Sequence, residues 1–208
     1  MATISFAITA CNEHVELQRL LQQLKPRPSD EVIIQMDTAT VTDEVKKVAQ
    51  VYGKPLNATR VFVPLDGDFA KFKNKLKDTC TKDYIFFIDA DEYLSEVLLL
   101  TLSDILDEPT NQVDMLMVPR VNTVEGLTED HIKMWGWSVS DAGRVNWPDF
   151  QTRIVKNIPE IKWEGRVHER VIGFNTMAAL PINTEDYALI HPKDIKRQER
   201  QNNYYNTL

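Results

Sequence analysis

The chain has 208 residues, of which 43 % are hydrophobic and 26 % are charged, a balance typical of a globular domain with a buried core. Its formal net charge of −7 argues against a broad contact with nucleic-acid phosphates, which favours a basic surface. No segment approaches the ~20 apolar residues of a membrane span, the start lacks a signal-peptide pattern and only two cysteines are present, so a cytoplasmic protein is expected.

The first ninety residues are predicted to alternate strands with helices. An apolar run at 4–8 is followed by leucines at helical spacing, and the same order repeats at 31–52 and 60–76. The segment 84–88 is continuously apolar, which is typical of a central strand covered on both faces. We therefore predict an α/β fold with a mixed, mainly parallel central sheet and flanking helices, whose ligands bind beyond the carboxyl ends of the strands.

The second half of the chain has a different pattern. A helix is predicted at 95–106, and strands are predicted at 113–120, 151–155, 166–172 and 187–190. Residues 121–150 are expected to be irregular, with Trp135, Trp137 and Trp147 as core anchors or as a stacking platform. No linker or repeat is visible, so we predict a single domain over 1–208, with halves at 1–92 and 93–190 and a tail at 191–208.

An acidic cluster, Asp89-Ala90-Asp91-Glu92, directly follows the central apolar strand. In an extended chain residues i and i+2 point the same way, so Asp89 and Asp91 face one site. Two neighbouring carboxylates repel each other, and a hard divalent cation such as Mg²⁺ or Mn²⁺ relieves that repulsion and also suits a diphosphate. The cluster therefore predicts a metal site at the end of this strand.

Other metal and phosphate motifs are excluded by their spacing. A calcium-binding EF-hand that began at Asp89 would need glycine at Leu94 and glutamate at Leu100. The chain also lacks a Walker A sequence and any Gly-x-Gly-x-x-Gly, which disfavours phosphate-loop enzymes and dinucleotide dehydrogenases.

Six segments occur in an order that resembles a known family. They are Thr9–Glu13, Met36–Asp43, Asp68–Asn74, Asp89–Glu92, Trp163–Glu169 and Ile190–Lys193. Together they resemble the family-2 glycosyltransferases of GT-A (Rossmann-like) fold, and more closely the branch of lipopolysaccharide-core glucosyltransferases and small phage-encoded relatives. The resemblance implies a nucleotide-sugar half at 1–92 and a small acceptor-side lobe at 93–190.

The resemblance also implies a role for each matching position. Mn²⁺ or Mg²⁺ would be held by Asp89, Asp91 and His191. A nucleoside-diphosphate sugar, with UDP as the expected nucleotide, would be contacted by residues of the first half, namely Thr9, Asn12, Glu13, Asp37, Lys73, Asn74 and Asp89. The segment Asp37–Thr40 differs from the Asp-Ser-Gly-Ser usual in relatives, so it implies uracil recognition less directly than the acidic cluster implies a metal.

Each role has a structural alternative. Asn12 and Asp37 are common helix N-cap residues, His191 alone would be an ordinary histidine, and Lys73 would be solvated on an outward helix face. The basic tail is expected either to close over the donor, with Lys193 or Arg197 on the diphosphate, or to form a solvated helix.

The family relation implies inversion of the anomeric centre by direct displacement, which needs a general base for the acceptor hydroxyl. We favour Glu169, because it lies in a motif-bearing segment. Asp149 is the second candidate, and its structural alternative is a capping role or a pair with Arg153.

Two other functional classes stay open at this point: a nucleotidyltransferase, and a non-catalytic module that binds a nucleotide or sugar. Within the favoured class the acceptor is either a glycan such as lipopolysaccharide or, as in phage enzymes, a modified DNA base flipped into a pocket. For a phage-encoded enzyme, the expected location is the cytoplasm of the phage host.

Overall fold

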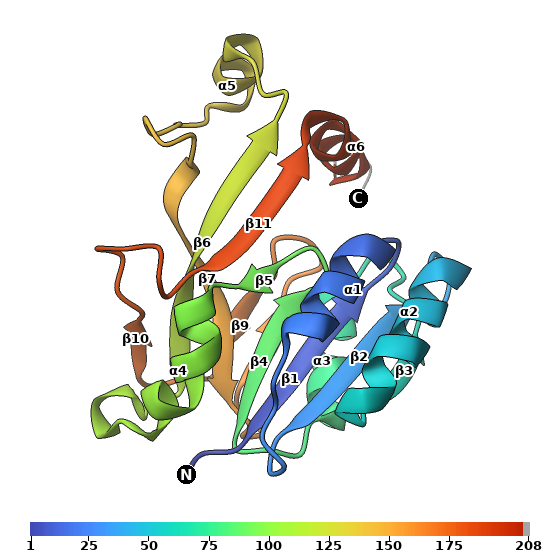
Figure 1. Ribbon diagram of the computed structural model, residues 1–208, viewed down its shortest axis with the longest axis vertical. Helices are drawn as coiled ribbons and strands as arrows, with labels where there is room; N and C mark the ends of the chain where they lie inside the picture. Colours follow the sequence, from blue (N-terminus) through green and yellow to red (C-terminus); the bar gives the residue numbers. More distant parts are fainter. Residues whose placement is uncertain (206–208) are drawn as a thin grey trace.

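The structure is a computed structural model that describes residues 1–205, so the predicted tail residues 206–208 lie outside the described part. It contains a nine-stranded sheet, a separate two-stranded hairpin and six α-helices (Figure 1). None of the helices in this part of the chain has the length and apolar character that crossing a membrane requires.

The elements follow one another as predicted in the first half and are more regular than predicted in the second. The strands are β1 (Ile4–Ala10), β2 (Glu31–Asp37), β3 (Thr59–Val63), β4 (Tyr84–Asp89), β5 (Tyr93–Leu94), β6 (Met115–Glu125), β7 (Val145–Lys156), β8 (Lys162–Glu164), β9 (Arg170–Ile172), β10 (Met177–Ala179) and β11 (Leu189–Asp194). The α-helices are α1 (His14–Gln23), α2 (Asp43–Gly53), α3 (Phe69–Thr79), α4 (Glu96–Asp107), α5 (Glu129–Trp135) and α6 (Ile195–Tyr205), with short 3₁₀ turns at η1 (Lys54–Leu56) and η2 (Pro109–Asn111).

The main sheet has the strand order β3-β2-β1-β4-β7-β6-β11-β5, and β10 also pairs with β6. The strands β3, β2, β1 and β4 are parallel, as are β6 and β11, whereas β7 runs antiparallel to both of its neighbours. The prediction of a mixed, mainly parallel sheet with flanking helices is confirmed. Since β4 and β7 are neighbours, the first and second halves of the chain share one sheet.

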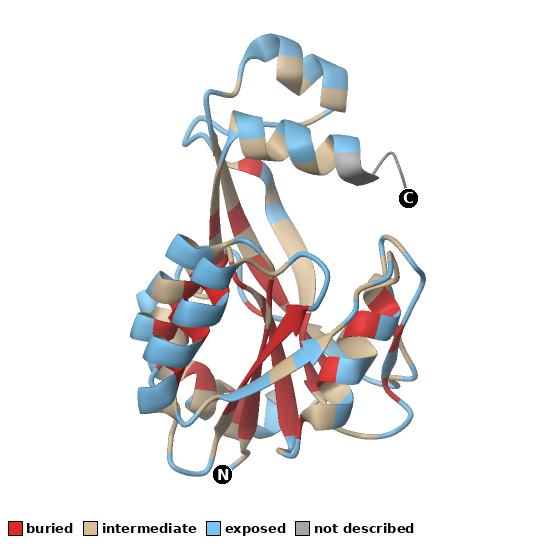
Figure 2. Cartoon of the chain, turned by 90° about the vertical axis from the view of Figure 1, so that its right-hand side faces the viewer, coloured by how far each residue is buried: buried red, intermediate tan, exposed pale blue. Residues whose placement is uncertain are grey.

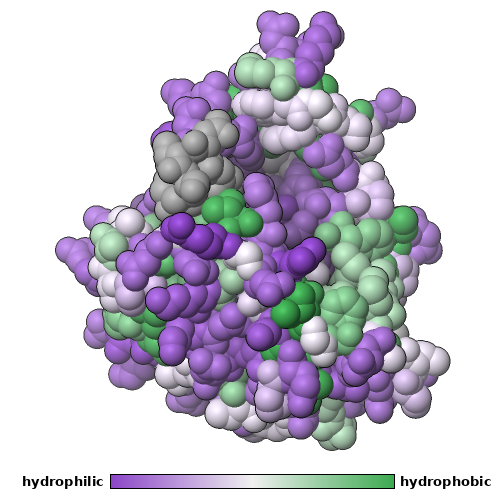
Figure 3. All heavy atoms as spheres, turned by 180° about the vertical axis from the view of Figure 1, so that it is seen from behind, coloured by the Kyte–Doolittle hydropathy of each residue, from purple (hydrophilic) through white to green (hydrophobic). Residues whose placement is uncertain are grey.

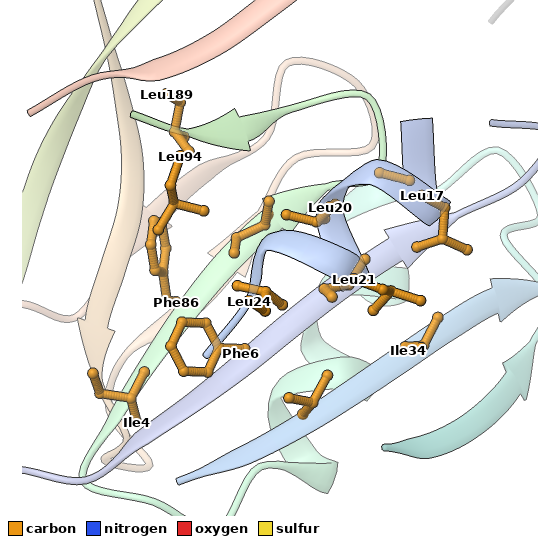
Figure 4. Close-up of a cluster of buried hydrophobic side chains, with 14 of the residues drawn as sticks. Ile4, Phe6, Leu17, Leu20, Leu21, Leu24, Ile34, Phe86, Leu94 and Leu189 are labelled. Carbon is orange, nitrogen blue, oxygen red and sulfur yellow. The ribbon is translucent and has the colours of Figure 1, made fainter. Parts of the chain in front are cut away.

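The central strand β4 contributes to both hydrophobic cores. Phe86 and Ile88 belong to the cluster that packs against α1, α2 and α4, whereas Ile85 and Phe87 belong to the cluster under α3 and the β8–β9 hairpin. All four side chains are at most 2 % exposed. The leucines of α1 lie over β1 and β2 (Figure 4), and the buried residues concentrate in the centre of the sheet (Figure 2). Burial on both faces explains the unbroken apolar run of this strand.

Helices α2, α3 and α4 begin at side chains that cap them, and these are not the two caps considered above. The side chains of Thr42, Asp68 and Ser95 accept backbone N–H groups in the first turns of α2, α3 and α4. Helix α1 begins after Glu13 without a side-chain cap. The cap roles suggested for Asn12 and Asp37 are therefore wrong.

Residues 121–150 are only partly irregular: β6 continues to Glu125, α5 spans Glu129–Trp135 and β7 begins at Val145, whereas 126–128 and 136–144 lie outside these elements. The long strands β6, β7 and β11 extend beyond the rest of the sheet and carry α5 and α6 as an upper lobe (Figures 1 and 2). The polar and aromatic residues here alternate with apolar ones over strands that are only half covered, which hid the β pattern. The strand predicted at 166–172 is instead a hairpin, in which β8 and β9 flank a loop at 165–169.

The tryptophans also differ from the core-anchor expectation. Trp135, Trp137 and Trp147 are only half-buried in the upper part of the molecule, whereas Trp163 on β8 is 6 % exposed and packs edge-on against Phe87 at a centroid distance of 5.3 Å. Trp163 is therefore the tryptophan that anchors a core.

Gly173 has a positive φ of +83°, and a Cβ at this position would lie 1.8 Å from the carbonyl oxygen of Glu160. We expect Gly173→Ala to lower the free energy of unfolding by at least ~2 kcal/mol, because backbone must move to relieve the clash. The matched control is Gly143→Ala, which also has a positive φ but nothing within 4 Å, and should cost about 1 kcal/mol. Urea denaturation measures both, and equal losses would contradict the packing explanation.

Candidate active site

The carboxyl ends of β1, β2 and β4 open into a cavity of about 630 Å³ below the upper lobe. The surface seen from behind is hollowed there and mainly hydrophilic (Figure 3). The cavity collects predicted site residues from the whole chain, namely Thr9, Glu13, Asp37, Lys73, Asp89, Asp91, Asp149, Glu169, His191 and Lys193. Asn12, Asn74 and Arg197 do not line it. The position at the strand ends agrees with the general rule for open α/β sheets.

Asp89 is held by residues from both halves of the chain. Its Oδ1 accepts a hydrogen bond from the Thr9 hydroxyl at 3.0 Å, and its Oδ2 accepts one from Nη2 of Arg153 at 2.7 Å. Burial alone would raise the pKa of this carboxyl, but the charges of Arg153 and Lys73 outweigh it and hold the pKa well below its ordinary value. Asp89 is therefore a carboxylate whose two oxygens already have partners.

Glu92 points away from the cavity, into the protein. Its side chain is fully buried and accepts hydrogen bonds from Nη1 of Arg120 at 3.0 Å and from Arg153. It also accepts the backbone N–H of Asp89 at 3.2 Å, which closes the turn after β4. The last member of the acidic cluster thus anchors the turn, and Asp89 and Asp91 are left to face the site.

Asp91 and His191 come together although 100 residues separate them in the sequence. Nε2 of His191 on β11 lies 3.1 Å from Oδ2 of Asp91. Burial would raise the pKa of Asp91, but the hydrogen bond and charge of His191 lower it well below its usual range. His191 of the opposite lobe thus lies beside the acidic cluster, as expected, and its role as a metal ligand stays a prediction.

The spacing of this pair fits a divalent cation. Two ligand atoms about 2.1 Å from an octahedral ion and 90° apart lie ~3.0 Å from each other, close to the observed 3.1 Å. Within residues 1–205, however, no three His, Cys, Asp or Glu side chains form a ready group of metal ligands. The three-ligand set predicted above is thus only partly assembled: Asp91 and His191 form the pair, and Asp89 is engaged by Arg153 and Thr9.

In the loops that follow β1 and β2, the carboxylates of Glu13 and Asp37 accept hydrogen bonds from nearby backbone N–H groups. Asp37 is buried and accepts hydrogen bonds from the backbone of Ala39 and Leu65 and from the Thr40 hydroxyl. Burial alone would raise the pKa of Asp37, but these hydrogen bonds lower it by more, so the net shift of the pKa is downward.

Glu13 similarly closes the first loop, because its Oε2 accepts the N–H groups of Cys11 at 2.8 Å and Asn12 at 2.9 Å. Asn12 itself is exposed and lies outside the cavity lining. The structure therefore gives no support for Asn12 as a nucleotide contact, whereas Glu13 and Asp37 shape the wall at which a nucleotide would bind.

Helix α3 contributes Lys73, which is not solvated. Its Nζ lies 2.5 Å from Oε1 of Glu169 and 4.4 Å from the ring centroid of Trp163, and both charged side chains are nearly buried. The favoured base and the predicted phosphate contact are thus an ion pair in the cavity wall. Asn74 does not reach the cavity, because its amide donates to the carbonyl of Trp163 and accepts its N–H, both at 2.8 Å. Its prediction as a nucleotide contact is replaced by a role in holding β8.

Asp149, the second candidate base, has a different environment from the one expected. Its partner is Arg120, which donates to Oδ2 from Nε at 2.9 Å and from Nη2 at 2.7 Å, and the suggested pair with Arg153 is absent from the described residues. Gln151 donates to Oδ1 at 2.7 Å. Burial raises the pKa of Asp149, but Arg120 and the other donors lower it overall, which makes it a weak base.

The tail helix α6 lies against the site through Arg197. This guanidinium contacts Glu16 at 2.7 Å, Asp91 at 3.3 Å and Glu13 at 3.4 Å, so it pairs with acidic residues of the first half. Lys193 lines the cavity and donates to Gln201 on α6, and burial lowers its pKa. The tail is therefore not a free solvated helix, and Lys193 is the tail cation that faces the cavity.

Sequence reasoning missed the residues that hold the acidic cluster in place. Arg120, Arg153 and Asn122 lie on the half-covered strands β6 and β7, where a charged residue looks like an ordinary exposed one. One signal was available in the sequence: Arg153 directly precedes the apolar residues Ile154 and Val155, so its charge lies next to a buried strand segment.

The aromatic side chains of the upper lobe form a cluster at the edge of the cavity. Trp137 lines the cavity, and its ring centroid lies 4.7 Å from that of Trp135, which in turn stacks on His131 at 5.1 Å. Of the two roles considered, a stacking surface therefore fits Trp137 better than a core anchor.

Arg197 places a positive charge where a metal ion would meet Asp91. We expect Arg197→Met to bind Mn²⁺ about 2–5 times more tightly in the absence of nucleotide, because a competing ion pair worth about 0.5–1 kcal/mol is lost. The control is Arg200→Met, which removes the same charge from an exposed position of the same helix. Titration followed by electron paramagnetic resonance compares them, and equal affinities in the two variants would contradict this role of Arg197.

The comparisons with known proteins agree with this fold. The TarS 1–349 fragment from S. aureus in complex with UDP-GlcNAc superposes with a TM-score of 0.64 at 15 % identity, over 93 % of this chain and 59 % of that one. The same fragment in complex with UDP gives a TM-score of 0.63 at 16 % identity, over 92 % and 60 % of the two chains. This chain thus spans about 60 % of the length of these fragments, and no curated protein matches it. The sequence pattern of "Glycosyl transferase family 2" matches residues 5–192, and the chain therefore belongs to glycosyltransferase family 2.

Proposed function

We propose that this chain transfers a sugar from a UDP-sugar to an acceptor hydroxyl, with inversion and with the help of Mn²⁺ or Mg²⁺. The observation that carries the proposal is the pair of Asp91 and His191, brought to 3.1 Å at the carboxyl end of β4 inside a cavity of about 630 Å³. A cavity of this size suits a ligand such as a nucleotide sugar. A UDP-sugar is favoured because the TarS fragment of similar fold was crystallised with UDP-GlcNAc.

The residues present suit a hard divalent cation. Asp91 supplies a carboxylate oxygen and His191 an imidazole nitrogen, and Mg²⁺-like ions commonly complete their coordination with substrate phosphates and water. When bound, such an ion would neutralise charge on the leaving diphosphate. Asp89, whose oxygens are held by Arg153 and Thr9, would orient the donor and add negative charge near the ion.

The remaining polar residues of the cavity divide into two groups in this proposal. Thr9, Glu13 and Asp37 lie at the ends of β1 and β2, on the side where the nucleoside would bind. Lys193, with its pKa lowered by burial, would face the diphosphate from the tail.

We assign the general base to Glu169. Within the described residues its carboxylate accepts a hydrogen bond from Lys73, whereas Asp149 accepts from Arg120, Asn122 and Gln151 and has a lowered pKa. A carboxylate with fewer donors is the better proton acceptor, because each donor stabilises its charged form. Donor phosphate near Lys73 would also draw this lysine away from Glu169, which frees the carboxylate for the acceptor hydroxyl.

For the acceptor we favour a glycan. Helix α6 carries both charge signs, with Glu199 between Lys196 and Arg200, and the chain has a net charge of −7, so neither offers a strongly basic surface to DNA phosphates. A sugar ring would stack on Trp137 at the cavity edge. Membership of the lipopolysaccharide-core branch or of the phage branch, and a modified DNA base as acceptor, stay predictions.

Of the alternative classes, the nucleotidyltransferase is disfavoured by the family match over residues 5–192. The non-catalytic binding module differs from the proposed enzyme in a measurable way, because an inert module need not depend on a metal ion.

We expect UDP to bind at least ten times more tightly with Mn²⁺ than in chelator, because the diphosphate would complete the coordination begun by Asp91 and His191. Isothermal titration calorimetry measures this difference. His191→Ala should remove most of it, whereas His14→Ala, on helix α1 outside the cavity lining, should not. Identical UDP affinity with Mn²⁺ and with chelator in the wild-type chain would contradict the proposed function.

Glu169→Gln should lower kcat by a factor of at least ~100 while the Kd for UDP-sugar changes little, because only the proton acceptor is lost. Asp149→Asn should instead weaken metal-dependent donor binding, because Arg120 and Asn122 lose their shared partner. Steady-state kinetics and donor titrations separate the two effects. If Glu169→Gln retains near-normal turnover, the assignment of the base is wrong.

A further inference from the structure

A row of hydrogen-bonded side chains crosses three neighbouring strands beside the proposed metal site. His191 on β11 is the Cα partner of Asn122 on β6, and Asp149 on β7 is the Cα partner of Arg120 on β6. The strand register therefore brings Asp149, Asn122 and His191 into contact in this order, and the row ends at Asp91.

The first step of the row determines how the Asn122 amide is oriented. Oδ2 of Asp149 accepts two hydrogen bonds from Arg120 and one from Nδ2 of Asn122 at 2.8 Å. Asp149 is ionised and can only accept, because its donors hold its pKa below the ordinary value. The NH₂ group of Asn122 must therefore face Asp149, and its carbonyl oxygen must face the other way.

The second step determines the tautomer of His191. Oδ1 of Asn122 lies 2.7 Å from Nδ1 of His191. A carbonyl oxygen only accepts, so Nδ1 carries the ring proton. A neutral imidazole has a single N–H, which leaves a lone pair on Nε2, and this atom faces Oδ2 of Asp91 at 3.1 Å. A proton or a metal ion between these two atoms binds to both of them, so a divalent cation can take the place of the hydrogen bond between His191 and Asp91.

We propose that Asn122 is a positioning residue that sets the tautomer of His191 and so keeps Nε2 open to a divalent cation. Without Asn122, the Asp91 carboxylate would be the acceptor left for the ring proton, which would then reside on Nε2 and block the cation. The relevance to sugar transfer rests on the proposed function, but the tautomer itself does not. Groups that orient a metal-binding histidine in this way typically change metal affinity 10–100-fold.

The tautomer can be measured in the metal-free protein by long-range ¹H–¹⁵N correlation of the His191 ring at about pH 9, where histidine is ordinarily neutral. We expect a protonated Nδ1 in the wild type and a protonated Nε2 in Asn122→Leu. Thr123→Leu, which places the same side chain at the next position of β6, should leave the ring unchanged.

The second readout is the affinity for Mn²⁺ in the presence of UDP. We expect Asn122→Leu to weaken it 10–100-fold and Thr123→Leu to match the wild type. Circular dichroism shows whether each variant folds. If Asn122→Leu does not fold, the ¹H–¹⁵N correlation of the wild type still shows which nitrogen of His191 carries the proton.

A wild-type ring with its proton on Nε2 would overturn the inference, as would a folded Asn122→Leu whose tautomer and Mn²⁺ affinity are unchanged. If the wild type has the Nδ1 proton but UDP binding needs no metal, the proposed function fails while the role of Asn122 in setting the tautomer stands. The two failures are therefore distinguishable.

Discussion

The mutual repulsion of three carboxylates within four residues is the constraint on which this site depends. Asp89, Asp91 and Glu92 follow one strand, and nothing in the first half of the chain neutralises all three. The second half supplies what is missing, since Arg153 pairs with Asp89 and Glu92, and Arg197 lies beside Asp91. Removing one partner from such a buried group costs several kcal/mol, because the remaining charge is left without compensation.

This arrangement explains why the two halves share one sheet. Strand β7 runs antiparallel to β4, the apolar strand that ends at Asp89, and its Arg153 donates to that carboxylate. The antiparallel strand thus places a cation at a point where the parallel strands have none. Glu92, fully buried between Arg120 and Arg153, links β4 to both β6 and β7. The order of the strands therefore determines the charge balance of the site, because it places Arg120 and Arg153 beside the acidic cluster.

The upper lobe adds the groups that the sheet cannot supply. Strand β11 brings His191 to Asp91, and the helix that follows it returns Arg197 to the acidic residues of α1 and of the site. The contacts of Arg197 with Glu13 and Glu16 join the two ends of the chain.

The local pattern of the sequence determined the fold class and the centre of the site. An apolar strand followed by acidic residues needs burial on both faces and a cation at its end, and these requirements follow from hydrophobicity and charge alone. The half-covered strands β6 and β7 escaped detection, because their alternation is blurred by polar residues that serve the site. The partners of Asp149, Glu92 and Asn74 were decided by the tertiary structure, since strand register and helix packing select one neighbour among many side chains of suitable chemistry. A carboxylate in the sequence indicates that a hydrogen-bond donor is needed, but only the folded chain determines which donor lies within about 3 Å.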